Sequence, residues 1–305
     1  MPDPDELLDD TAVRPAARGA RRRTVSEGPA VGHEVLSNPT SARISRVAGL
    51  SRRNARTKHR RFLVEGPQGV REAVRHAPGR VLDVYLTEAA LERHSEIWDE
   101  AVAAGLYVHV TTQQVMDAMS PDAQGLLAVV ATEEATGSEA LAAALEGARL
   151  VAVLTQAQDP GNAGTIIRAA DAAGADAVVL VRGSVDPTAP KVVRSTAGSL
   201  FHLPVVTGVA LDDAVTALHN AGLTVLAADG RGDFDLFEAE SLLEAPSAWL
   251  LGNEAHGLPS EALSRADAVV SIPIYGKAES LNVAAAAAVC LYASARAQAQ
   301  NSGRS

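Results

Sequence analysis

The sequence is poor in features that define several common protein classes. Its one cysteine, Cys290, lies in an alanine-rich run, which excludes disulfide frameworks and cysteine-based metal sites and fits a reducing cytoplasm. No stretch approaches 18 uninterrupted apolar residues, so we expect no membrane span. The acidic start MPDPDELLDD lacks the apolar core of a secretory signal. The eight histidines are scattered without ligand spacing, and we therefore expect no metal.

The usual nucleotide-binding and nucleophile motifs are missing as well. No GxGxxG follows the first strand pattern, and no Walker lysine motif is present, so the common dinucleotide and triphosphate sites are not indicated. No Ser-His-Asp or Cys-His arrangement suggests itself either. Any chemistry must therefore come from a different set of residues.

The chain has room for a substantial core. With 305 residues and 47% hydrophobic content, it predicts two domains. We expect a disordered arm over residues 1–40, a small α/β unit over 41–133, a connecting helix within 134–148 and a second α/β unit over 149–305. In both units apolar strand patterns alternate with helical ones, which predicts a mostly parallel or mixed sheet first and a doubly wound sheet second.

Four helix positions follow from local patterns. We expect one helix over 91–105, the connecting helix with Ser138 as its N-cap, a helix over 163–173 capped by Asn162, and a long terminal helix over about 281–298. Ser280 has the character of the N-cap of that last helix, and Asn282 of its first turn.

Net charge is −10, which argues against a nucleic-acid partner until its distribution is considered. Between Ser41 and Arg80, eleven basic residues face only Glu65 and Glu72, so this stretch carries +9 and the rest of the chain −19. The basic residues are Arg43, Arg46, Arg52, Arg53, Arg56, Lys58, Arg60, Arg61, Arg71, Arg75 and Arg80. Such a block can neutralise several phosphates of RNA, although a solvated helix face or a patch offset by acidic neighbours is the alternative.

Three polar and glycine-rich segments stand out in the second half, each at the end of an apolar strand pattern. The first, DPGNAGTIIRAADAAG (Asp159 to Gly174), places Arg168 among small and apolar neighbours. A guanidinium there is costly unless it is paired or reaches a phosphate or carboxylate. The ordinary explanation is an ion pair with Asp159 or Asp171.

The second and third segments carry further candidates. In LLGNEAHGLP (Leu250 to Pro259), Gly252 ends a strand and Glu254 follows, either to serve a ligand or Arg168, or as a turn residue facing water. His256 in the same loop is a weaker candidate for a base. In SIPIYGKAESLNVAAAAAV (Ser271 to Val289), Ser280 and Asn282 lie where free helix N–H groups favour electron-rich ligand atoms. The alanines that follow suit close helix packing, in the core or in a dimer.

Taken together, the pattern DPGNAG…R, GNE..G and IPI…SLNV…A resembles the three signature motifs of the SpoU (TrmH-type) RNA 2′-O-ribose methyltransferases of the SPOUT superfamily. The resemblance covers roughly residues 150 to 298. Within the first unit, FLVEG (Phe62 to Gly66) and QGLLAVV (Gln124 to Val130) resemble that family's substrate-binding domain, which is similar to a ribosomal-protein RNA-binding fold.

The resemblance implies a C-terminal domain with a trefoil knot, S-adenosylmethionine as cofactor and a homodimer. It assigns the cofactor to Gly252, Ile272 and Leu281, with Ala228 as a weaker candidate. It also implies that the residues for catalysis and substrate orientation are Asn162, Arg168, Glu254, Ser280 and Asn282. For RNA binding the basic block supplies Arg52, Arg53, Arg56, Lys58, Arg60 and Arg61.

The implied activity is ribose methylation of RNA, with ribosomal RNA of the 23S type as the expected substrate. A transfer-RNA methyltransferase is the alternative within the enzyme class, disfavoured because the family's tRNA enzymes usually lack such an N-terminal domain. A non-catalytic RNA-binding or ribosome-assembly factor is the alternative from another class, and binding of S-adenosylmethionine separates it from the enzymes.

Overall fold

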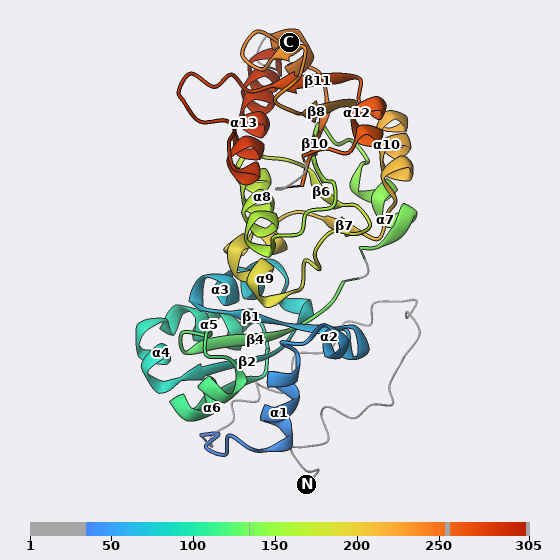
Figure 1. Cartoon of the computed structure of the whole chain (residues 1–305). Helices are drawn as coiled ribbons and strands as arrows, with labels where there is room; N and C mark the ends of the chain where they lie inside the picture. Colours follow the sequence, from blue (N-terminus) through green and yellow to red (C-terminus); the bar gives the residue numbers. More distant parts are fainter. Residues whose placement is uncertain (1–34, 134, 254–256, 303–305) are drawn as a thin grey trace. The chain divides into compact units, whose positions relative to one another are not determined.

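The computed structural model describes residues 35–133, 135–253 and 257–302, in two compact units that comprise residues 1–131 and 132–305 (Figure 1). Most of the arm predicted to be disordered, together with Glu254 and His256, lies outside the described residues. The end of that arm is ordered, however. Leu36 donates its N–H to Val110 and accepts from Thr112, which extends the edge of the first sheet, so the folded part begins before Ser41.

The first unit is built on a mixed four-stranded sheet in the order β1-β4-β2-β3. Its strands are β1 (Arg61–Glu65), β2 (Val81–Thr87), β3 (Val108–Thr111) and β4 (Leu126–Ala131). β4 runs antiparallel to both β1 and β2, and β2 pairs in parallel with β3. The predicted mixed sheet is thereby confirmed.

Helices cover both faces of this sheet. They are α1 (Ala42–Gly49), α2 (Arg53–His59), α3 (Pro67–His76), α4 (Glu88–Arg93), α5 (Ser95–Ala103) and α6 (Gln113–Met119). α1 and α6 bury Ile44, Val47 and Met116 against Leu63, Tyr85 and Leu127 of the sheet. α3 packs on β1, β2 and β4. The single helix predicted over 91–105 is wrong: His94 has non-helical backbone angles and separates α4 from α5, a break that no proline or glycine marks in the sequence.

The second unit contains an all-parallel seven-stranded sheet in the order β7-β6-β5-β10-β8-β11-β9. The strands are β5 (Leu150–Leu154), β6 (Ala177–Leu180), β7 (Val205–Thr207), β8 (Thr224–Ala228), β9 (Phe234–Asp235), β10 (Ser247–Leu251) and β11 (Ala268–Ser271). β5, β6 and β10 are buried at every residue, as strands covered on both faces require. β10 lies between β5 and β8, although it follows β8 in the chain.

Two layers of helices sandwich this sheet, which confirms the doubly wound prediction (Figure 1). On one face, α8 (Pro160–Ala172) and α13 (Val283–Ser302) pack against side chains such as Leu154 and Trp249. On the other, α7 (Gly137–Ala144), α10 (Leu211–Asn220) and α12 (Ser260–Arg265) cover Val153, Val225 and Leu250. The short helices α9 (Pro190–Thr196) and α11 (Glu240–Leu243) pack on α8 and α13 respectively.

The connecting helix differs from its prediction. It begins at Gly137, so Ser138 lies inside its first turn, and Thr136 takes the N-cap position without a side-chain hydrogen bond. α7 packs on α10 and β7 and so forms part of the second unit. Among the described helices, none is both long and apolar enough to cross a membrane.

Candidate functional site

Three neighbouring strands of the second sheet end at residues that the family resemblance assigned to the cofactor. β10, β8 and β11 are adjacent and parallel, so their carboxyl ends share one edge. Ala228 ends β8, Gly252 follows β10 and Ile272 follows β11. Open α/β sheets bind ligands at this edge. The structure thus brings these three candidates together from segments up to 44 positions apart in the chain.

Gly252 is held so closely that no side chain fits there. A Cβ atom at this position would lie 2.5 Å from the carbonyl carbon of Gly257 and 2.6 Å from the nitrogen of Leu258. The backbones of Asn253 and Gly257 exchange two hydrogen bonds of 2.9 Å, which closes the loop after β10. Any larger residue at 252 must therefore displace the backbone of Gly257 and Leu258.

The loop after β5 is fastened to the loop after β10. Thr155 donates through both its backbone N–H and its hydroxyl to the carbonyl oxygen of Leu251 at 2.9 Å. The amide of Asn253 donates to the carbonyl of Gln156 at 3.0 Å, and Gln156 has a positive φ of 56°. Gln156 and Asn253 carried no assignment from the sequence. Their contact joins the second polar segment to the loop that leads from β5 into the first segment.

The first and third segments meet through two asparagines. The amide of Asn282 donates to the side-chain oxygen of Asn162 at 3.1 Å, across 120 positions of sequence. At the other end of the same two helices, the Tyr292 hydroxyl donates to the carbonyl of Ala172 at 3.0 Å. α8 and α13 therefore lie side by side and run in the same direction, with their N-termini together (Figure 1).

Both predicted N-caps at these helix ends are wrong. Asp159, which precedes Pro160, caps α8 by accepting from the N–H of Asn162 at 2.8 Å. That bond is the main reason that the pKa of Asp159 is lowered, and the nearby Lys191 adds to it. At α13 the side chain of Asn282, not Ser280, accepts from the N–H groups of Ala284 and Ala285 at 2.8 and 3.4 Å. Asn282 therefore caps its helix and bonds Asn162 at once.

Arg168 is exposed on α8, and the ion pairs considered for it do not form. Asp159 pairs with Lys191 at 3.7 Å, and Asp171 bonds His202 at 2.8 Å. Within the described part of the chain, Arg168 makes no hydrogen bond or ion pair. Its guanidinium is thus available to an anionic ligand, which is the less ordinary of the two explanations. Ser280 and Leu281 are exposed in the segment that leads into α13.

The basic block of the first unit divides into two parts. Arg52, Arg53, Lys58 and Arg60 are exposed on and around α2, and no acidic residue occurs between Val35 and Val64. Arg61 is partly buried at the start of β1. In the later part, two arginines have acidic partners: Arg75 makes two hydrogen bonds of 2.6 and 2.7 Å to Glu100, and Arg71 pairs with Glu72.

Arg56 is buried and so does not belong among the predicted RNA contacts. Its side chain is only 5% exposed, and its guanidinium donates to the carbonyl oxygens of Leu50 and Ser51 at 3.3 and 2.8 Å. It ties the end of α1 to α2. Sequence reasoning could not separate it from its exposed neighbours, because a run of arginines has the same composition whichever one turns inward.

Comparisons with known proteins bear on both units. Residues 149–292 match the model of the SpoU rRNA methylase family, and residues 41–128 match that of the MRM3-like substrate-binding domain. The 23S rRNA (guanosine(2553)-2′-O)-methyltransferase RlmP of Bacillus subtilis (strain 168) is 35% identical over 80% of this chain and 92% of its own length. The chain belongs to the SpoU rRNA methylase family. A second relative, the 23S rRNA (uridine(2479)-2′-O)-methyltransferase of Streptomyces viridochromogenes, is 35% identical over 81% of this chain and 86% of its own.

Solved SpoU structures agree with the fold. An AdoMet-bound rRNA methyltransferase from Sinorhizobium meliloti matches with a TM-score of 0.72 and 28% identity, over 86% of this chain and 97% of that one. The AviRb methyltransferase of Streptomyces viridochromogenes in complex with AdoMet matches with a TM-score of 0.69 and 31% identity, over 85% and 100%. The α/β class and the family resemblance expected from the sequence are confirmed.

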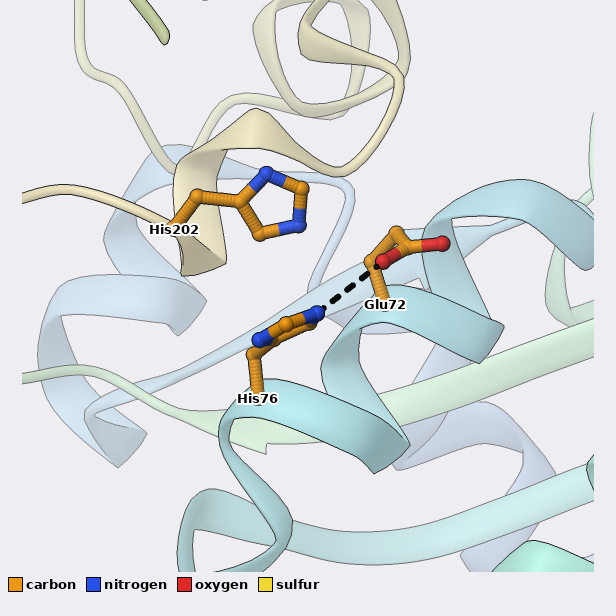
Figure 2. Close-up of side chains that lie close together, drawn as sticks. All are labelled: Glu72, His76 and His202. Atoms are coloured by element: carbon orange, nitrogen blue, oxygen red, sulfur yellow. Dashed lines mark ion pairs between the residues drawn. The ribbon is translucent and has the colours of Figure 1, made fainter. Parts of the chain in front are cut away.

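Cys290 and two of the described histidines of this SpoU protein, His76 and His202, are held by their surroundings. Cys290 faces the core, and burial raises the pKa of its thiol to about 12. His76 pairs with Glu72 on α3 at 3.3 Å, as Figure 2 shows. In the second unit, His202 is bonded to Asp171. His76 and His202 each have a carboxylate partner in their own unit, whereas His256, the histidine considered as a base, lies outside the described residues.

Proposed function

We propose that this protein methylates the 2′-oxygen of a ribose in ribosomal RNA, with S-adenosylmethionine as methyl donor. The observation that carries the proposal is the meeting of three sequence segments at one sheet edge, with Asn162 and Asn282 joined directly. The relatives named as 23S rRNA 2′-O-methyltransferases support the reaction and the substrate class. The AdoMet-bound family structures support the cofactor.

The edge formed by Ala228, Gly252 and Ile272 suits this cofactor. Bare backbone at Gly252 offers N–H and C=O groups to an adenine ring or a carboxylate, and any Cβ there would collide with Gly257. Ile272 and Leu281 supply apolar surface, Leu281 being 40% exposed before α13. When bound, the cofactor supplies an activated methyl group on a sulfonium. We propose that these four residues hold it.

Arg168 is proposed to bind the phosphate beside the target ribose and to stabilise negative charge that develops on the 2′-oxygen. It is not proposed as the base, because a guanidinium essentially does not lose its proton in a protein. Asn162 and Asn282 are proposed to fix the ribose, since methyl transfer depends on an aligned approach of the 2′-oxygen. Glu254 and Ser280 are proposed to orient the substrate or Arg168.

The first unit is proposed to deliver the RNA. Arg52, Arg53, Lys58 and Arg60 form an exposed basic surface around α2, and Arg61 lies at its margin. Phosphate contacts of this kind give affinity without reading sequence, which suits a structured RNA recognised by shape and 2′-hydroxyls.

We further propose a homodimer, a trefoil knot and a cytoplasmic location, as in the family resemblance. The dimer is supported by an exposed row on α13 that contains Ala285 and Tyr292, where small side chains allow close packing. The knot is supported by the passage of β10 between β5 and β8 and by the closed loop at Gly252. Sedimentation equilibrium of the wild type and of Ala285→Arg tests the dimer.

Substitution of Arg168 tests the reaction. We expect Arg168→Ala to lose more than nine tenths of wild-type turnover, a barrier change above ~1.4 kcal/mol, while calorimetry gives an unchanged Kd for S-adenosylmethionine. The assay is transfer of labelled methyl groups to 23S rRNA, followed by mapping of the methylated ribose. Arg265→Ala is the matched control, because Arg265 is an exposed helical arginine paired with Asp212 on the opposite helical layer.

Three results would overturn parts of this proposal. If Arg168→Ala retains more than a tenth of wild-type turnover, the role proposed for Arg168 is wrong. If the protein methylates tRNA but not rRNA, the proposed substrate is wrong. A wild-type protein that fails to bind S-adenosylmethionine at millimolar concentration is a non-catalytic RNA-binding factor.

A further inference from the structure

One side of α8 is shaped to receive α9. Gly161, Gly164 and Arg168 are three and four positions apart and so lie along the same side of the helix. At Gly164 a Cβ atom would be 2.5 Å from both the carbonyl oxygen of Val192 and the Cβ of Ser195. The two helices therefore touch backbone to backbone, and the position of α9 relative to α8 is fixed.

The contacts continue in order along both segments. A Cβ at Gly161 would lie 3.8 Å from the Cε of Lys191, one turn before the contact of Gly164 with Ser195. Further on, Asp171 bonds His202 at 2.8 Å. The segment from α9 to His202 thus runs parallel to α8, with Lys191 beside the N-terminal end of α8.

Lys191 of α9 therefore lies beside Gly161, on the side of α8 that carries Arg168 one level further along the helix. Seven residues separate Gly161 from Arg168, about 10 Å of rise. Because helical side chains lean toward the N-terminus, we expect the guanidinium of Arg168 to point back toward the level of Lys191. Two cations follow one another toward the helix end at which Asn162 and Asn282 meet.

The present partner of Lys191 holds it only weakly. Its ammonium is 3.7 Å from the carboxylate of Asp159, and the two side chains are 61% and 45% exposed. Ion pairs as open as this contribute little to stability. Asp159 is also engaged as the cap of α8, where it accepts from Asn162. The ammonium can therefore turn to a phosphate at small cost.

We propose that Lys191 binds a phosphate of the substrate RNA strand, next to the phosphate held by Arg168. This inference rests on the proposed function and deepens it by adding a second point of attachment for the strand. A lysine ammonium is a compact charge that binds phosphate without a fixed fork geometry, so it complements the planar guanidinium of Arg168. The two contacts set the direction in which the strand crosses the site.

The test compares RNA affinity in four variants at several salt concentrations. Anisotropy of a labelled 23S rRNA fragment gives Kd for Lys191→Ala, Lys191→Arg, Asp159→Asn and Arg265→Ala. We expect Lys191→Ala to weaken binding about fivefold near 0.1 M salt and to reduce the slope of log K against log salt by about 0.7 to 0.9, the value for one phosphate contact. Lys191→Arg retains the slope, and Arg265→Ala stays within twofold of the wild type.

Asp159→Asn separates RNA binding from a structural role, because asparagine caps a helix as well as aspartate does but cannot pair with Lys191. If Lys191 only steadies Asp159, both Asp159→Asn and Lys191→Ala weaken RNA binding to the same extent, and the inference is wrong. An unchanged salt slope in Lys191→Ala also overturns it. We expect Asp159→Asn to bind RNA at least as tightly as the wild type, since a negative charge beside the phosphate has been removed.

Failure of the proposed function gives a different result. A wild-type protein that binds the fragment but transfers no methyl group refutes the methyltransferase, whereas the salt slopes still report on Lys191. Conversely, the wild type could methylate RNA while Lys191→Ala keeps the wild-type salt dependence of RNA binding. That result refutes only the role of Lys191.

Discussion

The two units of this protein use polar residues in opposite ways. In the first, exposed cations are spread over α2 and its surroundings, and nothing fixes Arg52 or Arg53 against another described side chain. In the second, the polar residues converge on one sheet edge and are tied by defined hydrogen bonds, such as Asn282 to Asn162. Attraction of RNA by charge tolerates loose geometry, whereas chemistry at one ribose requires fixed positions. Substitutions should therefore have graded effects in the first unit and abrupt ones in the second.

The largest effect is expected at the tightest backbone contact. Gly252→Ala places a methyl group 2.5 Å from the carbonyl carbon of Gly257 and must open the loop after β10. We expect the affinity for S-adenosylmethionine to fall at least 100-fold, about 2.7 kcal/mol, with RNA affinity within twofold of the wild type. Calorimetry and RNA anisotropy measure the two.

Gly79→Ala in the first unit is the matched control, because nothing lies within 4 Å of a Cβ there. It should leave both affinities unchanged. Circular dichroism checks that Gly252→Ala is folded. A folded Gly252→Ala variant that binds the cofactor as tightly as the wild type would contradict the abrupt effects expected in the second unit.

A smaller and graded effect is expected from the basic surface. The triple variant Arg52→Ala, Arg53→Ala, Lys58→Ala removes three positive charges without touching the core. We expect RNA binding to weaken about 30-fold near 0.1 M salt and the salt slope to fall by about 2, because three phosphate contacts are lost or weakened. Cofactor affinity should not change.

The control for that variant carries Arg71→Ala and Arg75→Ala, since these arginines are paired with Glu72 and Glu100. We expect less than a threefold loss of RNA affinity from it. If the two variants lose the same RNA affinity for each charge removed, RNA binding depends only on total charge. The surface around α2 then has no special role.

The smallest effect is expected at Asn282, which both caps α13 and belongs to the candidate site. Asn282→Asp keeps an N-cap oxygen but replaces the amide that donates to Asn162. We expect unfolding free energy within ~1 kcal/mol of the wild type and about a tenfold loss of turnover, the worth of roughly one hydrogen bond. Chemical denaturation and the methylation assay measure these.

Asn162→Ala tests the same contact from its other end. If the two asparagines act as a unit, the double variant is no slower than the slower single variant. Additive losses would mean that each asparagine works alone.

Much of the second unit could be predicted from the sequence, because its strands are continuous apolar runs such as Leu150 to Leu154 and its polar segments follow them. Strand order could not. Nothing in SAWLL reveals that β10 enters between β5 and β8, since every fully buried strand has the same pattern. The short strand β9 and helix α11 were also missed, because two to four residues carry no periodicity.

Helix ends were the weakest predictions, for a local reason. Asp159, Asn162, Ser280 and Asn282 are all good cap residues, and only the geometry decides which one turns toward the free N–H groups. At α8, Pro160 was the signal that should have pointed to Asp159, because proline favours the first helical position. At α13 no such signal exists. Arg56 is buried because it donates to the carbonyl of Leu50 at the end of α1. The sequence of the arginine run does not show where α1 ends.

The pairing of α8 with α13 couples their lengths. Ten residues separate Asn162 from Ala172, and ten separate Asn282 from Tyr292, so the two hydrogen bonds close at both ends only if each helix keeps its residue count. Deleting one residue from either helix shifts its end by about 1.5 Å and turns it by about 100°. Insertions and deletions in this part of the chain should therefore be confined to the loops, and a length change in one helix would need a matching change in the other.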